Sequence, residues 1–202
     1  MPTAARIFAA AMLAALTACS SHAGGRNAAS APDYGAAPAF SLPDAAGGTF
    51  SLAAHRGGVV VLSFVAANCS QECPQMEAVL KRGAERWRAA GMLGKHVTIA
   101  TVELDPKSNS MLAVARLRAK TWPADGWAFL RGTPEQTRAV LAGYGITVLP
   151  PPKGHDDVEH TAEVYVIDPN GRESAILAPG ANLTLRSLEQ AVSSALAAPR
   201  GA

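Results

Sequence analysis

Several features are scarce in this chain of 202 residues, and each scarcity excludes a class of protein. The formal net charge is only +2 and the basic residues form no run, which argues against nucleic acid as a partner. No apolar run approaches the roughly 20 residues that a membrane-spanning helix needs. Aromatic residues make up only 5% of the chain, but the total hydrophobic share of 49% is enough for a core. The chain has only three cysteines. The chain is long enough for one domain with extensions.

The first residues indicate a secretory leader. Arg6 is the only charged side chain before an apolar stretch over residues 7–16, which has the length of a signal-peptide core. The following Leu16-Thr17-Ala18-Cys19 resembles the lipobox of bacterial lipoproteins. This resemblance implies a signal peptide over residues 1–18, cleavage before Cys19 and a lipid on its sulfur. The alternative is an ordinary signal peptide that contains a cysteine. We expect an extracytoplasmic protein, lipid-anchored to a bacterial membrane and facing the periplasm or the cell exterior.

The mature chain divides into a tether and one domain. Residues 19–38 are dominated by Ser, Ala, Gly, Asn and Pro, which cannot bury a core and predict a flexible tether from Cys19. Residues 39–199 carry the apolar periodicity of a folded domain.

Within this domain strands and helices alternate. Strands are predicted at residues 40–42, 49–52, 59–65, 97–104, 127–130, 161–167 and 173–177, and helices at 71–90, 110–119, from 133 onward and at 183–197. The continuous β-branched run at 59–65 is typical of a strand covered on both faces. We therefore predict an α/β domain with a thioredoxin-like fold: a central mixed sheet flanked by helices, with an N-terminal β-hairpin.

Two cysteines stand where the strand at 59–65 passes into the long helix. Cys69 and Cys73 are four positions apart, so on a helical turn they share one face, about 5–6 Å apart at Cβ. That spacing allows either one metal ion between the sulfurs or a disulfide. The first helical turn also favours the thiolate form. With Cys19 assigned to the lipid, no odd thiol remains.

A third metal ligand has five candidate histidines. His160 is the best placed, because it stands immediately before a strand in the region that a thioredoxin-like sheet brings near the cysteines. The others are predicted to be tether, loop or strand-edge residues without a metal: His22, His55, His96 and His155.

The ordered motifs of the domain resemble the Sco/SenC family of copper-binding, thioredoxin-like proteins. The matching stretches begin at residues 40 (Phe-Ser-Leu-Pro-Asp), 69 (Cys-Ser-Gln-Glu-Cys-Pro), 102 (Val-Glu-Leu-Asp-Pro), 132 (Gly-Thr-Pro-Glu-Gln), 158 (Val-Glu-His-Thr) and 164 (Val-Tyr-Val-Ile-Asp). This resemblance implies that copper, as Cu(I) or Cu(II), binds to Cys69, Cys73 and His160. It spans residues 40–177, nearly the whole domain.

The chain departs from the family pattern at three places. The family usually has Pro-Asp-Val between the cysteines where this chain has Ser70-Gln71-Glu72. Asn109-Ser110-Met111 replaces the usual Asp-Thr-Pro, and Glu159 replaces an aspartate before the histidine. These departures leave the ligand set intact and affect the surfaces that dock a particular partner.

Two thiolates and an imidazole are soft and borderline ligands of the kind that suits copper. Zinc in an open Cys₂His site would instead imply hydrolysis or alcohol oxidation, for which the sequence offers no nearby general base or cofactor motif. Asp105, at the end of a neighbouring strand, is a possible group of the second ligand shell, or it simply makes a turn. Methionines at residues 76, 92 and 111 are predicted to fill the core rather than to bind metal.

The leading hypothesis is a membrane-tethered copper chaperone rather than an enzyme. By resemblance to the family, its partner is the copper-bearing subunit of a respiratory cytochrome oxidase or another copper protein. The alternative is an extracytoplasmic thiol–disulfide oxidoreductase, with Cys69 as attacking and Cys73 as resolving thiol, that reduces the cysteines of a copper-site client. A weaker alternative is a peroxidase that acts through Cys69 alone.

Overall fold

The computed structural model describes residues 33–66, 72–104, 125–149, 153 and 159–200. Its elements in chain order are β1 (Ser41–Pro43), β2 (Thr49–Ser51), a 3₁₀ turn η1 (Leu52–His55), β3 (Val59–Val65), α1 (Glu72–Ala89), β4 (Val97–Glu103), β5 (Trp127–Leu130), α3 (Pro134–Gly143), β6 (Val148–Leu149), β7 (Glu159–His160), β8 (Val164–Ile167), β9 (Glu173–Leu177) and α4 (Leu185–Leu196). The predicted helix at residues 110–119 lies outside the described residues.

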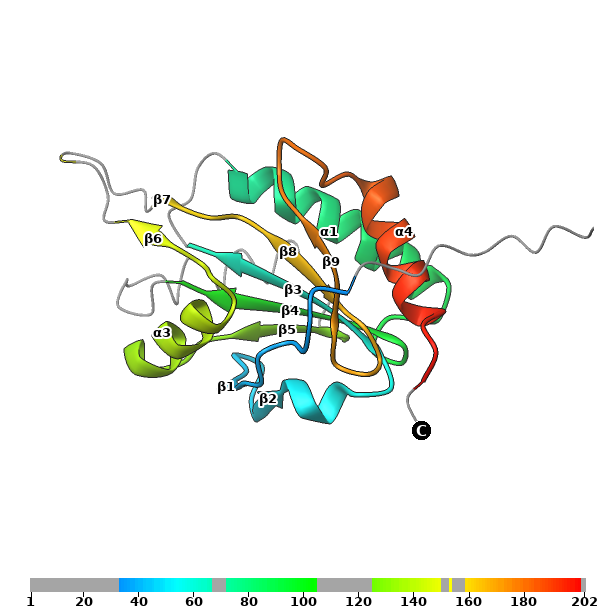
Figure 1. Cartoon of the computed structure of the whole chain (residues 1–202), viewed down its shortest axis with the longest axis horizontal. Helices are drawn as coiled ribbons and strands as arrows, with labels where there is room; N and C mark the ends of the chain where they lie inside the picture. Colours follow the sequence, from blue (N-terminus) through cyan, green and yellow to red (C-terminus); the bar gives the residue numbers. More distant parts are fainter. Residues whose placement is uncertain (1–32, 67–71, 105–124, 150–152, 154–158, 201–202) are drawn as a thin grey trace, which may run out of the picture.

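A five-stranded mixed sheet forms the centre of the domain (Figure 1). The strand order is β5-β4-β3-β8-β9; β3, β4 and β5 run parallel, whereas β8 is antiparallel to β3 and β9 to β8. The predicted thioredoxin-like architecture with an N-terminal hairpin is confirmed. The carboxyl ends of the three parallel strands meet at one end of the sheet, where α/β folds usually place their ligands.

Two hydrophobic clusters hold the layers together, one on each face of the sheet. Every residue of β3 is buried, so alternate side chains enter opposite clusters. One cluster packs against α1 and α4, and the other against α3, η1 and the β1–β2 hairpin. Burial on both faces explains why this strand is apolar at every position except Ser63.

Helix α1 faces the sheet with an apolar stripe at helical spacing. Met76, Leu80 and Ala84 are fully buried, and Trp87 is nearly so. The helix stops at Gly91, whose φ of +68° is a left-handed conformation that glycine adopts without steric cost. Helix α3 begins as its sequence predicts, with Thr133 and Gln136 forming a reciprocal capping box and Pro134 in the first turn.

The structure differs from the sequence prediction in one segment. The strand expected at residues 161–167 begins only at Val164, as β8, and the short strand β7 precedes it, with three residues between the two. The short strand β7 leaves the main sheet and pairs with β6, which the sequence analysis did not predict. The resulting two-stranded unit, β6 and β7, is called the β6–β7 ribbon below.

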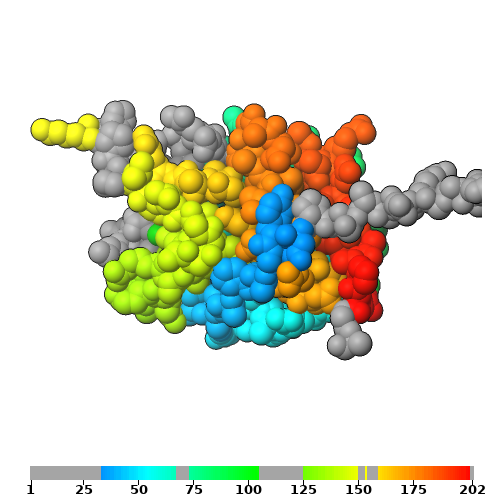
Figure 2. All heavy atoms as spheres, in the orientation of Figure 1, coloured from blue at the N-terminus to red at the C-terminus, as the bar shows by residue number. Residues whose placement is uncertain are grey.

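Segments from outside the sheet pair with part of each of its edges. Asp44 bridges to Leu130 and the Ala45 N–H donates to the Phe129 carbonyl, so the hairpin lies on the β5 edge. At the other edge the Tyr34 N–H donates to the Glu173 carbonyl. Figure 2 shows this blue segment lying against the orange residues around β9. Residues 33–38, which composition assigns to the tether, therefore lie against the domain.

Within the described residues, no helix is long and apolar enough to cross a membrane.

Candidate metal centre

Cys73 lies in the first turn of α1, above the carboxyl end of β3. Its side chain is buried in the same cluster as Val65, the last residue of β3, and Val164, the first residue of β8. Strand β3 and helix α1 thus place this thiol at the end of the sheet, as the sequence predicts. Cys69, the other predicted thiol ligand, lies outside the described residues.

The β6–β7 ribbon supplies the imidazole. His160 pairs directly with Val148, and the next residue, Thr161, fixes the ribbon with two hydrogen bonds to Thr147. In one the Thr161 N–H donates to the Thr147 carbonyl, and in the other the Thr147 N–H donates to Thr161 Oγ1, each at 3.1 Å. The imidazole is therefore carried by a hydrogen-bonded two-stranded ribbon. It lies next to α1 in space, although it follows α1 by many residues in sequence.

The two side chains are in contact. The Sγ of Cys73 lies 3.3 Å from Nε2 of His160, across 87 positions of sequence. Cys73 is disulfide-bonded in the structure, and the remaining cysteines, Cys19 and Cys69, lie outside the described residues. This geometry therefore belongs to the oxidised form of the site.

The backbone sets the orientation and tautomer of the imidazole. His160 Nδ1 lies 2.9 Å from the carbonyl oxygen of Thr161. A carbonyl oxygen only accepts, so Nδ1 carries the proton and donates, which leaves the Nε2 lone pair directed at the sulfur. This is the arrangement by which metal-bound histidines are usually oriented, with the outer nitrogen donating to a fixed acceptor.

The spacing fits a shared metal ion. Metal–nitrogen and metal–sulfur bonds of roughly 2.0 and 2.3 Å, joined at a roughly tetrahedral angle, place the two ligand atoms about 3.3–3.7 Å apart. The observed Cys73–His160 separation lies within that range. The separation is therefore compatible with a metal shared by this sulfur and nitrogen, as it is with a hydrogen bond between them. Within the described residues, no group of three or more His, Cys, Asp or Glu side chains could hold a metal ion.

Glu77 stands one helical turn beyond Cys73 and was missed from the sequence. Burial raises the pKa of Glu77 from its ordinary value of 4.5 to about 7. Removal of the carboxylate from water is the cause, since burial disfavours the charged form. A single glutamate beside an apolar helical stripe gave no pattern by which sequence reasoning could have found this carboxyl group.

A second carboxylate is buried at the same end of the sheet. Glu103, the last residue of β4, pairs in register with Val65 and is fully buried. Arg131, just beyond β5, brings its Nε to 3.4 Å from the Glu103 carboxylate. An ion pair therefore lies on the strand next to the one that leads into the site.

The structure places other predicted residues away from the site. His55 stacks on Phe50 at 4.2 Å between ring centroids and its Nδ1 lies 2.9 Å from the Ser51 carbonyl, while His96 is exposed. Met76 is fully buried in the core, and the partly buried Met92 packs against that core. Several residues considered from the sequence lie outside the described residues: Cys19, His22, Asp105, Met111 and His155.

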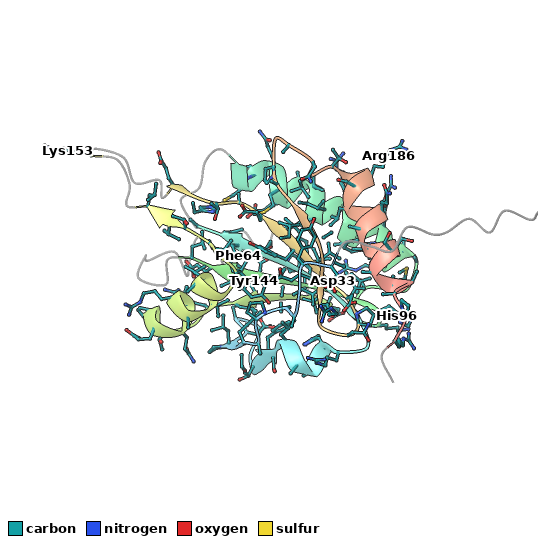
Figure 3. The ribbon with its side chains drawn as sticks, in the orientation of Figure 1. Asp33, Phe64, His96, Tyr144, Lys153 and Arg186 are labelled. Carbon is teal, nitrogen blue, oxygen red and sulfur yellow. The ribbon has the colours of Figure 1, made fainter. Side chains whose placement is uncertain are left out.

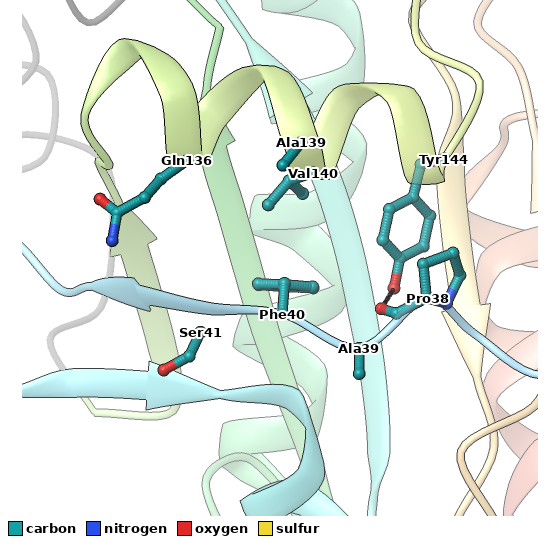
Figure 4. Close-up of a pocket in the computed structure, with 8 residues that line it drawn as sticks. All are labelled: Pro38, Ala39, Phe40, Ser41, Gln136, Ala139, Val140 and Tyr144. Carbon is teal, nitrogen blue, oxygen red and sulfur yellow. Dashed lines mark hydrogen bonds between the residues drawn. The ribbon is translucent and has the colours of Figure 1, made fainter.

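A separate hollow of about 200 Å³ opens between α3 and the segment that leads into β1 (Figure 4). Phe40 and Val140 line it, and the Tyr144 hydroxyl donates to the Pro38 carbonyl at 3.0 Å. Its lining carries no carboxylate, imidazole or thiol, so it offers no acid–base or metal chemistry.

A thioredoxin-like fold with a cysteine at the start of the first core helix and a histidine in contact with it defines a thiol- and metal-handling protein. The chain belongs to the SCO1/SenC family, whose model matches residues 28–194. The family expected from the sequence motifs is therefore confirmed.

The relatives are distant in sequence and close in fold. A curated SCO1 protein homolog of Bacillus subtilis is 25% identical over 136 residues, covering 66% of this chain and 68% of its own length. The copper-bound ScoI of Arabidopsis thaliana is 18% identical with a TM-score of 0.65, covering 79% of this chain and 98% of that one. BsSco, described as carrying a disulfide switch, is 22% identical with a TM-score of 0.66 and coverages of 82% and 95%. A SCO1/SenC family lipoprotein from Bacillus anthracis is 20% identical with a TM-score of 0.66 and coverages of 78% and 93%.

Proposed function

We propose that this chain is a membrane-tethered copper chaperone that binds copper through Cys69, Cys73 and His160. It delivers the metal to the copper centre of a respiratory cytochrome oxidase. The observation that carries the proposal is the 3.3 Å contact between Cys73 Sγ and His160 Nε2. Family membership and the copper-bound Arabidopsis relative support the choice of metal.

The ligand set favours transfer over storage. Two thiolates and one imidazole suit copper and leave it with a low coordination number. Ligands of an acceptor protein can then attack the metal and displace the donors one at a time. Loading requires both thiols to be reduced and deprotonated and His160 to be neutral, so affinity falls on oxidation or acidification.

The location of the protein is part of the same proposal. Lipidated Cys19 anchors residues 19–32 to a bacterial membrane, with the domain facing the periplasm or cell exterior; a lipoprotein relative supports this assignment. We also propose that Asp105 acts in the second ligand shell, because it stands two residues beyond Glu103, the buried last residue of β4.

Anaerobic titration of the reduced protein with Cu(I) tests the ligand set. We expect one tight equivalent for the native chain and a large loss of affinity for His160→Ala. His96→Ala is the matched control, because His96 is exposed and remote from the contact described above. Unchanged affinity in His160→Ala would remove this imidazole from the site, and the proposal with it.

One observation favours a second function, an extracytoplasmic thiol–disulfide oxidoreductase that reduces the cysteines of a copper-site client. Cys73 is disulfide-bonded in the structure, which is the state such a pair reaches after its dithiol has passed two electrons to a client disulfide. An external dithiol then has to reduce the pair again before the next turnover. Turnover with a disulfide-bonded client peptide that survives His160→Ala and is abolished by Cys73→Ser would favour this function. Loss of metal binding in both variants without any turnover would favour the chaperone.

A further inference from the structure

Positive charge gathers on the outer surface of the α1–α4 layer. The C-terminal half of α1 carries Lys81, Arg82, Arg86 and Arg88, and α4 adds Arg186, which Figure 3 labels. Against these five cations the same outer surface has two acids, Glu85 and Glu189. This surface, defined by the five cations, is called the helix face below.

The two helices form one continuous surface. Leu188 of α4 packs beside Gly83 of α1, where an added Cβ would lie 3.3 Å from the leucine Cδ2. On the solvent side Arg86 spans the helix boundary to Glu189 at 2.9 Å. Arg86 of α1 and Glu189 of α4, about 100 residues apart in sequence, therefore meet on the solvent side of the two helices.

Most of this charge is not neutralised by neighbours. Arg86 is paired with Glu189, but Lys81, Arg82, Arg88 and Arg186 form no ion pair with any residue in the part of the chain that the structure describes. Over the remainder of those residues, acidic side chains outnumber basic ones. Among the described residues, positive charge is therefore concentrated on the helix face.

Helix dipoles do not explain the pattern. Arg86 and Arg88 lie in the last turn of α1, where the negative end of the dipole favours them. Arg186 lies in the first turn of α4, where the positive end of the dipole disfavours a cation. The charges thus follow the face of the layer rather than the ends of its helices.

The chain enters the domain near the C-terminal end of α4. Arg172 holds Asp33 at 2.7 Å, and Asn170, two residues earlier in the same turn, donates to the carbonyl of Pro199 just beyond α4. Asp33 is therefore close to the C-terminal end of α4. Fourteen residues lead from Cys19 to Asp33, a reach of at most about 50 Å. A lipid on Cys19 is thus able to bring the helix face against a bilayer.

We propose that the helix face binds the anionic phospholipid surface of the membrane. Unpaired Lys and Arg side chains each add attraction to acidic headgroups at such a surface. The inference rests on the proposed tether only for delivery of the domain to the bilayer. In this orientation α1 lies along the membrane, and the Cys73 end of the sheet opens sideways, toward other proteins in the same membrane.

Lysine footprinting tests the inference with the full-length chain, expressed with its own leader and reconstituted in vesicles. Acetylation of Lys81 is compared with that of Lys153, an exposed lysine beyond β6, in phosphatidylcholine vesicles with and without phosphatidylglycerol. We expect Lys81 to be protected roughly fivefold or more by the anionic lipid, since one cation at such a surface contributes about that factor. Protection should disappear at 0.5 M salt, because surface charge is then screened within a few ångströms.

A triple variant supplies the second readout. Arg82→Gln, Arg88→Gln and Arg186→Gln together should abolish the protection of Lys81. Arg56→Gln, Arg138→Gln and Arg200→Gln, which remove the same charge elsewhere, should leave it intact. Equal reactivity of Lys81 in both vesicle types, or protection that survives the first triple variant, would overturn the inference. Failure of the chain to stay bound to vesicles of phosphatidylcholine alone would count against the lipid anchor and not against this inference. The inference is judged separately, from the acetylation of Lys81 relative to Lys153 with and without anionic lipid.

Discussion

Val148 lies directly opposite His160 on the β6–β7 ribbon, so a strand of two residues fixes the position of the imidazole. The ribbon is short and relies on the Thr161 side chain as well as on backbone pairing. A substitution that loosens the ribbon is therefore expected to disturb the geometry of the site without damage to the core.

Thr161→Val tests this dependence. The substitution keeps the side-chain shape and removes the Oγ1 that accepts from the Thr147 N–H. We expect Cu(I) affinity to fall roughly tenfold, the lower range for loss of a group that orients a ligand. Thr49→Val, on an exposed position of β2, should leave the affinity unchanged. Equal affinities in the two variants would show that the ribbon does not orient His160.

Glu77→Gln should change stability in a pH-dependent way. The carboxyl has a pKa near 4.5 when unfolded and about 7 when folded, so folding favours its protonated form. Its contribution is favourable below pH 4.5 and is lost as the pH rises to 7. The neutral variant should therefore be more stable than the native chain by about 1–2 kcal/mol at pH 8, after allowance for partial exposure, and nearly equal to it at pH 5.

Urea unfolding at the two pH values measures this difference. Glu85→Gln is the control, because it removes a carboxylate from an exposed position on the same helix. A stability gain for Glu77→Gln that is the same at pH 5 and pH 8 would contradict the raised pKa.

Glu103→Gln should be strongly destabilising. The substitution leaves Arg131, whose side chain is 19% exposed, without the carboxylate that faces it at 3.4 Å. Removal of one partner of a buried pair costs about 3–5 kcal/mol, and partial exposure of Arg131 places the expected loss near the lower limit. Glu135→Gln breaks the Arg138 pair, in which both side chains are more than 70% exposed, and should cost less than about 1 kcal/mol.

Chemical denaturation of both variants checks the comparison. Similar small losses would mean that the Glu103 carboxylate is compensated by other groups. The Cu(I) affinity of Glu103→Gln, measured under conditions where it remains folded, would then show whether this ion pair also acts on the site.

Ser63→Ala tests the buried polar contacts beneath the site. Ser63 and Thr101 are joined at 2.9 Å on adjacent strands, and Trp127 Nε1 donates to the same threonine oxygen. Because Thr101 keeps the tryptophan donor, we expect a loss of only about 1 kcal/mol in the free energy of unfolding. A loss above roughly 3 kcal/mol would mean that the serine anchors a larger network than these two bonds.

Local patterns predicted most of the fold. Apart from Ser63, β3 is a continuous apolar run, and α1 repeats apolar residues every three to four positions. A capping threonine and a proline mark the start of α3. These features involve only a few neighbouring residues, so they can be recognised in the sequence alone. The ribbon is different, since two paired residues on each side generate no periodicity.

The site could be predicted only in part. The strand-to-helix junction identified Cys73, and family resemblance selected His160 among five histidines; the structure brings these two into contact. Their role as metal ligands, with Cys69, stays a prediction. The helix face was not predicted, because its cations lie on two helices separated by about 100 residues and form a surface only after folding.

The coverage of both sheet edges limits how this protein can meet another chain. The hairpin occupies the backbone donors and acceptors beside β5, and residues 34–37 do the same around the β8–β9 turn. Strand exchange and edge-to-edge stacking, the routes by which exposed sheets aggregate, are blocked along these borders. Contact with another chain is therefore left to side-chain surfaces, such as the Cys73 end of the sheet, and not to backbone pairing along these borders.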